Sequence, residues 1–332
     1  MNIKENLNEI TKLLLASKTE KEEINSVKLL SCFYENIFRK VSSEELNKTK
    51  LEVNGGIALS PRHAKDCLYD YIRTARFIKG VYKAINSTKE KFVDEVLEVV
   101  YAGCGPLGTL IIPLLSYYDS KKIRIVLIDI HEASMISVKK IIKYLNYEKY
   151  IKEYCLTDAT KYVHNKKDSL HVVITETMDK ALINEPQISI TQNLVAQLSE
   201  GGVLVPEEIK LSTRNSFLAK ENCFGNNVVL DEEYINDKEF KGLFSITKNI
   251  KKTKNEFSFE SDYIVFDKYF EKTPDICIYT EIRVFDDVYI GKGESLITNP
   301  YCVKSLYSVN ESSYKLGYVT KKIPKWNVKN TQ

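Results

Sequence analysis

A short apolar segment that runs straight into a glycine-rich turn constrains this chain more than any other feature. Residues 96–101 (VLEVVY) are rich in β-branched side chains and predict a buried strand. The strand leads into Gly103-Cys-Gly105-Pro-Leu-Gly108. Glycines at this spacing let the backbone turn tightly and let a nucleotide approach the main chain. The pattern therefore predicts a cofactor that contains a nucleotide, either a nicotinamide dinucleotide or S-adenosyl-L-methionine (SAM).

Strands and helices alternate after this turn. Short apolar segments predict further strands at 123–128, 154–156, 172–175 and 203–205. Helical spacing of apolar residues predicts helices between them at 109–118, 134–145 and 189–198. Strands that alternate with helices form a parallel sheet covered on both faces. We therefore expect an α/β, doubly wound, Rossmann-like domain.

The regions on either side of this domain have a different pattern of apolar and polar residues. Residues 1–54 predict an N-terminal helical segment, and a further helix is expected from Pro61 to about residue 83. After Pro206 the pattern changes to alternating apolar and polar residues, which predicts strands at 276–285 and 295–298.

Composition excludes several classes of function. The chain has 48 Lys and Arg against 45 Asp and Glu, and a net charge of +3 does not call for a nucleic-acid partner. Seven scattered cysteines without a C-x-x-C pair, together with four histidines, do not predict a metal site. The first residues are charged and the apolar run 110–115 is too short to span a membrane. We expect a cytoplasmic protein.

Two aspartates follow the next strands. Asp129 ends the segment VLID, 21 residues after Gly108. An acid at this spacing binds the ribose hydroxyls of a dinucleotide, the alternative being that Asp129 only caps the following helix. Asp158 follows the third predicted strand, at the edge where ligands bind in such sheets. We expect it either to accept a hydrogen bond from an adenine amino group or to be an ordinary loop residue.

Two glutamates flank a short loop after the fourth strand. The strand at 172–175 ends in Glu176-Thr-Met178, and Glu185 follows nine residues after Glu176. Two carboxylates that face one pocket repel each other unless a cation lies between them. A guanidinium suits this place because it is planar, always charged and binds carboxylates with two parallel hydrogen bonds. The pair predicts a guanidinium site, the alternative being that Glu185, ahead of Pro186, is an exposed loop residue.

These glutamates resemble the double-glutamate loop of the protein arginine methyltransferases. Residues 70–74 (DYIRT) are similar to the family's D-x-x-R-T segment, and residues 198–206 (LSEGGVLVP) to its L-x-x-G-G-x-x-x-P strand. Residues 295–300 (SLITNP) resemble the segment that precedes the family's Thr-His-Trp loop. The resemblance covers about 55–300. It implies an enzyme that transfers a methyl group from SAM to a guanidino nitrogen, with Glu176 and Glu185 as the catalytic residues.

The resemblance also implies roles on the cofactor side. Arg73 would bind the carboxylate of SAM, and Gly103 and Gly105 would pack under the cofactor. Met178 would lie near the sulfonium, the alternative being a place in the core. Asp129 would hold the ribose, and Asp158 would lie near the adenine.

The domain roles follow from the same resemblance. Residues 55–206 would form the SAM-binding methyltransferase domain, and residues 207–332 a β-rich, barrel-like domain for substrate binding and dimerisation. Members of the family are dimers through a helical arm, and residues 231–244 are the segment expected to form a short one. We therefore expect a homodimer.

The acceptor side departs from the family's pattern. No histidine follows His171, so the Thr-His-Trp loop has no counterpart, and the single tryptophan is Trp326. Enzymes that modify arginine-rich proteins favour an acidic surface, which the net charge of +3 does not indicate. We therefore expect the acceptor to be free L-arginine or a related small guanidino metabolite. The alternatives are arginine in a peptide or protein, and another small nitrogen or oxygen acceptor.

Overall fold

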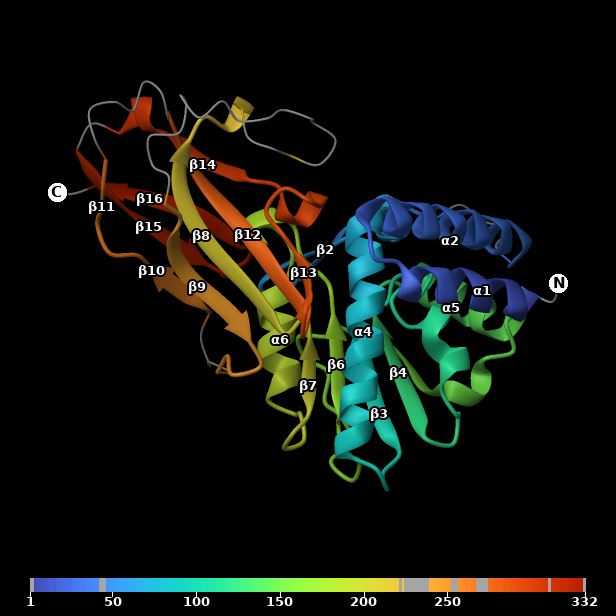
Figure 1. Ribbon diagram of the computed structural model, residues 1–332. Coiled ribbons are helices and arrows are strands. Elements are labelled where there is room, and N and C mark those ends of the chain that lie inside the picture. Colours follow the sequence, from blue (N-terminus) through green and yellow to red (C-terminus); the bar gives the residue numbers. More distant parts are fainter. Residues whose placement is uncertain are drawn as a thin grey trace.

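The computed structural model contains a pair of N-terminal helices, a parallel sheet and an antiparallel β-rich half, in that order along the chain (Figure 1). The residues it describes are 3–41, 46–220, 223, 239–251, 256–266, 274–309 and 312–330. Among these residues, no helix has the length and apolar character needed to cross a membrane.

The parallel sheet has five strands in the order β5-β4-β3-β6-β7. They are β3 (Leu97–Ala102), β4 (Ile123–Asp129), β5 (Ile151–Leu156), β6 (Val172–Thr175) and β7 (Val203–Val205). The chain runs from β3 outward to β5 and then returns to the other side of β3 at β6. The connections after β3 and β6 therefore leave the sheet in opposite directions. Ligands bind at such a switch point, outside the carboxyl ends of the strands.

Alternate residues of this sheet face two different layers. Val99 and Ile125 belong to a core cluster that includes the N-terminal helices, whereas Val100 and Val126 belong to a second cluster. The first layer contains α1 (Ile3–Ala16), α2 (Glu20–Val41), α4 (Tyr71–Lys91) and α5 (Glu132–Tyr144). The second layer contains α6 (Gln187–Val195). Helices on both faces confirm the doubly wound α/β prediction (Figure 1).

The single helix expected from residue 61 to about 83 is divided. Helix α3 (Pro61–Asp66) passes into a 3-10 turn (Cys67–Tyr69), and α4 begins after Asp70. Asp70 has a non-helical backbone, with φ −78° and ψ 86°, and its carboxylate accepts a hydrogen bond from the N–H of Arg73. This break makes Asp70 the N-cap of α4 and sets Arg73 in the first turn of the helix.

The C-terminal half is antiparallel, as its alternating sequence predicts. Its larger sheet has the order β13-β12-β8-β9, with β14 also paired to β12. The strands are β8 (Glu208–Ser216), β9 (Lys241–Thr247), β12 (Asp275–Phe285), β13 (Val288–Ile290) and β14 (Tyr301–Ser305). In the smaller sheet, β15 pairs with three strands. These elements are β10 (Ser258–Glu260), β11 (Ile264–Val265), β15 (Ser313–Val319) and β16 (Lys325–Asn330). Within the described part of the chain, the two sheets do not close into a barrel.

Two segments of the antiparallel half can be compared with what the sequence predicted for them. Of the expected dimerisation arm, residues 241–244 lie in strand β9 and residues 231–238 fall outside the described residues. The segment 295–298, expected as a strand, forms the 3-10 helix η7 (Leu296–Thr298). A capping box closes the start of η7. The side chain of Ser295 accepts a hydrogen bond from the backbone of the turn, and the backbone N–H of Ser295 donates one to a side chain of the turn, so these backbone groups are satisfied.

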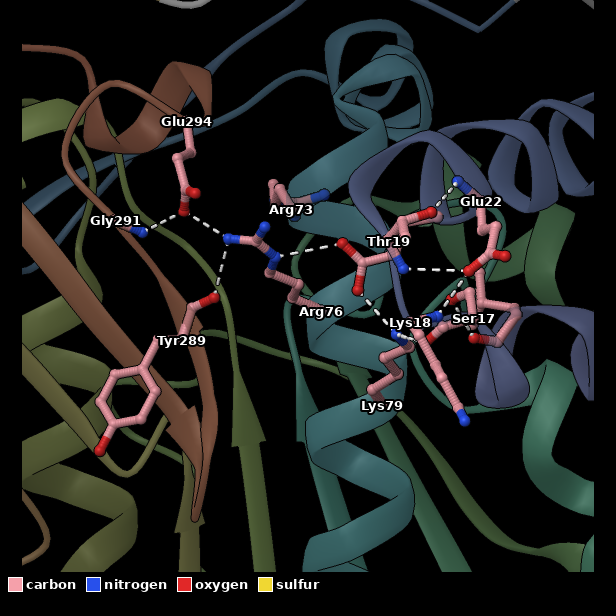
Figure 2. Close-up of polar contacts among 12 residues, drawn as sticks. Ser17, Lys18, Thr19, Glu22, Arg73, Arg76, Lys79, Tyr289, Gly291 and Glu294 are labelled. Carbon is pink, nitrogen blue, oxygen red and sulfur yellow. Dashed lines mark hydrogen bonds and ion pairs between the residues drawn. The ribbon is translucent and has the colours of Figure 1, made fainter.

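A polar network around Arg76 connects the three parts of the molecule (Figure 2). From the second turn of α4, the Nε of Arg76 lies 3.3 Å from the Glu23 carboxylate of α2, and its Nη1 donates to the carbonyl of Tyr289 in β13 at 3.0 Å. Arg76 also pairs with Glu294, which follows β13. Lys79, one turn further along α4, reaches Glu23 at 2.7 Å. Helix α4 is therefore fixed between the N-terminal helices and the antiparallel half.

Candidate active site

The eight residues singled out from the sequence line one open cavity of about 1110 Å³ at the carboxyl ends of β3, β4 and β6. They are Arg73, Gly103, Gly105, Asp129, Asp158, Glu176, Met178 and Glu185. This volume includes space open to solvent, and the lining combines apolar side chains with a few charged ones, as small-molecule sites do. The described residues contain no cluster of three or more His, Cys, Asp or Glu that could hold a metal ion.

The glycine-rich turn forms the floor of the cavity. Gly103 and Gly105 have φ values of 69° and 62°, a backbone conformation that residues with a Cβ rarely adopt. A Cβ on Gly103 would lie 2.4 Å from the Cγ2 of Thr177 in the loop after β6. The turn after β3 and the loop after β6 can therefore approach each other only with glycine at this position.

Asp129 connects this turn to the end of β4. Its two carboxylate oxygens accept hydrogen bonds from the N–H of Gly105 at 2.9 Å and the N–H of His131 at 2.8 Å. Burial raises the pKa of Asp129 to about 6, against the stabilising effect of these backbone donors on the charged form. Each carboxylate oxygen keeps further acceptor capacity, so Asp129 is able to accept from hydroxyl groups of a ligand.

Asp158 lies on the neighbouring loop, after β5. Its Oδ1 accepts hydrogen bonds from the N–H and the hydroxyl of Thr160, at 2.9 and 2.8 Å. Its other oxygen lies 3.6 Å from the exposed ammonium of Lys161. The carboxylate is thereby held at the cavity wall with one oxygen available to a ligand. Both interpretations of Asp158 from the sequence are compatible with this position.

Arg73 and Glu176 form an ion pair inside the cavity, with their side chains 9% and 5% exposed. Arg73 also donates from Nη1 to the carbonyl of Cys67 at 3.3 Å. Its buried Nε has no hydrogen-bond partner among the described residues. A buried donor without a partner is costly, so this atom indicates a place for an acceptor on a ligand.

Glu185 lies at the end of the loop that follows Glu176. Burial, reinforced by the negative charge of Asp179, raises the pKa of Glu185 to about 7, while Arg73 and Lys50 act in the opposite direction. Since Arg73 pairs with Glu176 and also acts on Glu185, both carboxylates lie within the influence of one guanidinium. The sequence alternative of an exposed Glu185 is wrong, because this residue lines the cavity and is only partly accessible.

Met178 lies both in the core and at the cavity wall, which are the two places that the sequence analysis left open for it. The residue is 3% exposed and is part of the main core cluster, and it also lines the cavity. Met178 is therefore a buried, apolar part of the cavity wall in the loop that joins Glu176 to Glu185.

Two parts of the site could not be anticipated from local sequence. The hairpin of β1 (Leu51–Val53) and β2 (Gly56–Ala58) contributes Val53 and Ala58 to the cavity wall. Helix η7 contributes a further wall, because the Asp70 carboxylate accepts hydrogen bonds from Ser295 at 2.6 Å and from the N–H of Leu296 at 2.9 Å. The sequence analysis singled out residues 70–74 and 295–300 separately, but nothing in it indicated that these segments contact each other across more than 200 positions.

Comparisons with known proteins found solved structures with a similar architecture. No family model matches the chain, and no curated protein matches its sequence. Among solved structures, the Arabidopsis thaliana protein arginine methyltransferase 10, in an open conformation, is similar with a TM-score of 0.51 and 12% sequence identity. The match covers 80% of this chain and 96% of that one. The chain therefore has a fold similar to that of the Arabidopsis protein, a doubly wound α/β domain followed by an antiparallel β-rich half.

A second solved structure also matches. It is the Trypanosoma brucei PRMT1 enzyme-prozyme heterotetrameric complex with AdoHcy, with a TM-score of 0.47 and 12% identity. This match covers 76% of this chain and 85% of that one.

Proposed function

We propose that this protein is a SAM-dependent methyltransferase that acts on a guanidino nitrogen. The observation that carries the proposal is the buried ion pair between Arg73 and Glu176 in the cavity that Glu185 also lines. In this pair Glu176 already accepts a guanidinium, while Arg73 keeps one buried donor for an anionic ligand. A fixed cation beside a pair of carboxylates suits a reaction that brings together a cofactor with a carboxylate group and a cationic acceptor.

The cavity residues fit SAM as the cofactor. Its carboxylate is the acceptor that we assign to the free Nε of Arg73. Its ribose hydroxyls are assigned to Asp129, and its adenine amino group to the available oxygen of Asp158. Gly103 and Gly105 have no Cβ, so the main chain lies open to the cofactor between these groups.

The two glutamates act on the methyl acceptor. When bound, SAM supplies a methyl group that its sulfonium makes electrophilic. Glu176 and Glu185 orient the acceptor guanidinium and draw its positive charge toward the nitrogens that they contact, so that the reacting nitrogen becomes a better nucleophile. With a pKa of about 7, Glu185 is suited to accept the proton that this nitrogen loses when it is methylated.

The acceptor we propose is arginine in a peptide or protein. The Arabidopsis protein with a similar fold is a protein arginine methyltransferase. The expectation of free L-arginine depended on the missing Thr-His-Trp segment and on the net charge, and neither of these describes the cavity itself. Free L-arginine is therefore the second acceptor in the experiment.

Mass spectrometry after incubation with SAM tests the proposal. One reaction contains an arginine-containing peptide and the other contains free L-arginine. Methylation of the peptide supports the proposal, whereas methylation of free arginine alone would assign the enzyme to small-molecule metabolism. If neither acceptor is methylated while calorimetry shows that SAM binds, the two glutamates serve another acceptor and the guanidino proposal is wrong.

A further inference from the structure

The loop that carries Glu185 has an unfavourable backbone. Three residues in it that are not glycine, Ala181, Leu182 and Asn184, have φ values of 54°, 55° and 65°. Side chains with a Cβ rarely adopt this left-handed region, and such a conformation persists only when the surroundings hold it. The loop therefore depends on contacts from outside itself.

Two aromatic side chains of the smaller antiparallel sheet supply hydrogen bonds to this loop. The indole Nε1 of Trp326, in β16, donates to the carbonyl of Ala181 at 2.9 Å. The hydroxyl of Tyr318, in β15, donates to the carbonyl of Leu182 at 2.7 Å. These two carbonyls belong to the left-handed residues, so the bonds fix the peptide planes that the strained conformation creates.

The two donors are themselves rigid. The rings of Trp326 and Tyr318 pack against each other with centroids 4.9 Å apart, and the ring of Phe244 stacks on Trp326 at 5.8 Å. Tyr318 is fully buried and Trp326 is 7% exposed. Burial raises the pKa of Tyr318, so its hydroxyl remains a donor throughout the physiological range.

Other backbone contacts complete the clamp around the loop. The N–H of Ala181 donates to the hydroxyl of Thr280 in β12 at 3.1 Å. The N–H of Asn184 donates to the carbonyl of Pro324 at 3.2 Å, and its carbonyl accepts from the N–H of Ile57 in β2 at 2.8 Å. The loop is thus held from the antiparallel half on one side and from the hairpin on the other.

We propose that Trp326 and Tyr318 are positioning residues, whose hydrogen bonds to the Ala181 and Leu182 carbonyls aim Glu185 into the cavity. The catalytic part of this inference rests on the proposed function, because it gives Glu185 the task of binding the acceptor. The structural part, that these two donors hold the loop, does not depend on it. The two parts are tested separately.

Three variants that each remove one buried donor and keep the ring or most of its volume test the structural part. Trp326→Phe and Tyr318→Phe remove the two donors to the loop. Tyr314→Phe is the matched control, because Tyr314 also lies in β15, is fully buried and donates its hydroxyl to Asn215 at 2.7 Å, away from the loop. Hydrogen–deuterium exchange of the peptide that covers residues 179–186 is the measurement.

Exchange in 179–186 should become at least tenfold faster in Trp326→Phe and Tyr318→Phe and stay unchanged in Tyr314→Phe. This experiment requires no substrate, so it is decisive even if the protein methylates neither acceptor. Equal exchange in all three variants would overturn the proposal. If Trp326→Phe does not fold, the comparison of Tyr318→Phe with Tyr314→Phe still decides it.

Kinetics test the catalytic part. In Trp326→Phe and Tyr318→Phe, kcat should fall at least tenfold while KM for SAM changes less than twofold. On its acidic side, the pH profile of kcat should also move to lower pH, because a loosened loop admits water to Glu185 and water stabilises its charged form. The charged neighbours of Glu185 are Asp179, Arg73 and Lys50, and its other titratable neighbour is the Cys67 thiol. A profile and kcat that match those of Tyr314→Phe would overturn the positioning role, even where exchange is faster.

Discussion

The hydroxyl of Ser295 donates a hydrogen bond to the Asp70 carboxylate at 2.6 Å, and this contact joins the start of α4 to η7 across 225 positions of sequence. Both residues are buried. The same carboxylate caps the N–H of Arg73. One acidic side chain therefore fixes both the first turn of the helix that carries Arg73 and a wall of the cavity.

Replacing Ser295 should destabilise the protein. Ser295→Ala removes a buried hydrogen bond to a charged group and should lower the free energy of unfolding by about 1.5–3 kcal/mol, measured by urea denaturation. Ser308→Ala is the control, because Ser308 is exposed and its hydroxyl only bonds the neighbouring carbonyl of Ser305. Its effect should stay within about 0.5 kcal/mol. Equal stability of the two variants would contradict the role of the Asp70 contact.

Replacing either glutamate of the pair should slow turnover strongly, and replacing Glu185 should do so without loss of the cofactor. Glu176→Gln and Glu185→Gln should each lower the rate of methyl transfer by roughly 10²–10⁴, because an amide neither pairs with a guanidinium nor accepts its proton. Calorimetry should show AdoHcy affinity within threefold of the wild type for Glu185→Gln. Glu281→Gln, which alters a carboxylate paired with Lys292 away from the cavity, should retain normal turnover.

The pH dependence of activity should follow Glu185. In the proposed reaction the acceptor binds the ionised carboxylate, and the pKa of Glu185 is raised to about 7, so kcat/KM for the acceptor should rise with pH through about 7 and then level off. Below that value it should fall roughly tenfold per pH unit. A profile without an inflection between pH 6 and 8 would show that Glu185 does not bind the acceptor in its charged form.

Stability should show the opposite trend at the same residue. The folded protein holds the Glu185 proton more tightly than the unfolded chain, since its pKa rises from 4.5 to about 7. Stability is therefore lost as pH increases between these two values. Glu185→Gln has no charge to bury, so it should be more stable than the wild type at pH 8, by about 3 kcal/mol at most. The difference should shrink toward zero near pH 4, and thermal unfolding at the two pH values measures it.

Arg73 should control binding of the cofactor. Arg73→Lys removes the buried Nε and the planar fork, and SAM affinity should fall about 10- to 100-fold in calorimetry because one charge-assisted hydrogen bond is lost. Arg62→Lys is the matched control, since Arg62 forms an exposed pair with Asp66 outside the cavity. Unchanged SAM affinity in Arg73→Lys would remove the assignment of the carboxylate to this residue.

The sequence predicted the parallel sheet well because its signals are local, and the eight residues singled out as a site line one cavity, while their roles stay predictions. A β-branched strand followed by glycines specifies its own turn, and parallel strands bring their carboxyl ends together wherever helices connect them. Residues 109–118 were expected as a full helix, but only Ile112–Tyr117 forms a 3-10 helix, in which Pro113 occupies an early position and donates no N–H.

The contacts that hold the site together could not be predicted in this way. The bond from Ser295 to Asp70 and the bond from Trp326 to Ala181 link residues more than 100 positions apart. No periodicity or motif carries such pairings, because they are decided by how the antiparallel half packs on the sheet. The strained φ values at Ala181 and Leu182 likewise contradict local preference, and only the packed structure maintains them.

The distance of 145 residues between Ala181 and Trp326 has a consequence for biosynthesis. At ribosomal rates of about 5–20 residues per second, the nascent chain carries the glutamate loop for roughly 7–30 s before its tryptophan anchor is made. The parallel sheet is completed by β7 well before that moment. The parallel sheet of a newly made chain is therefore complete first, the cavity wall from η7 is added later, and the loop that carries Glu185 receives its tryptophan hydrogen bond only when the last strand of the smaller sheet has been made.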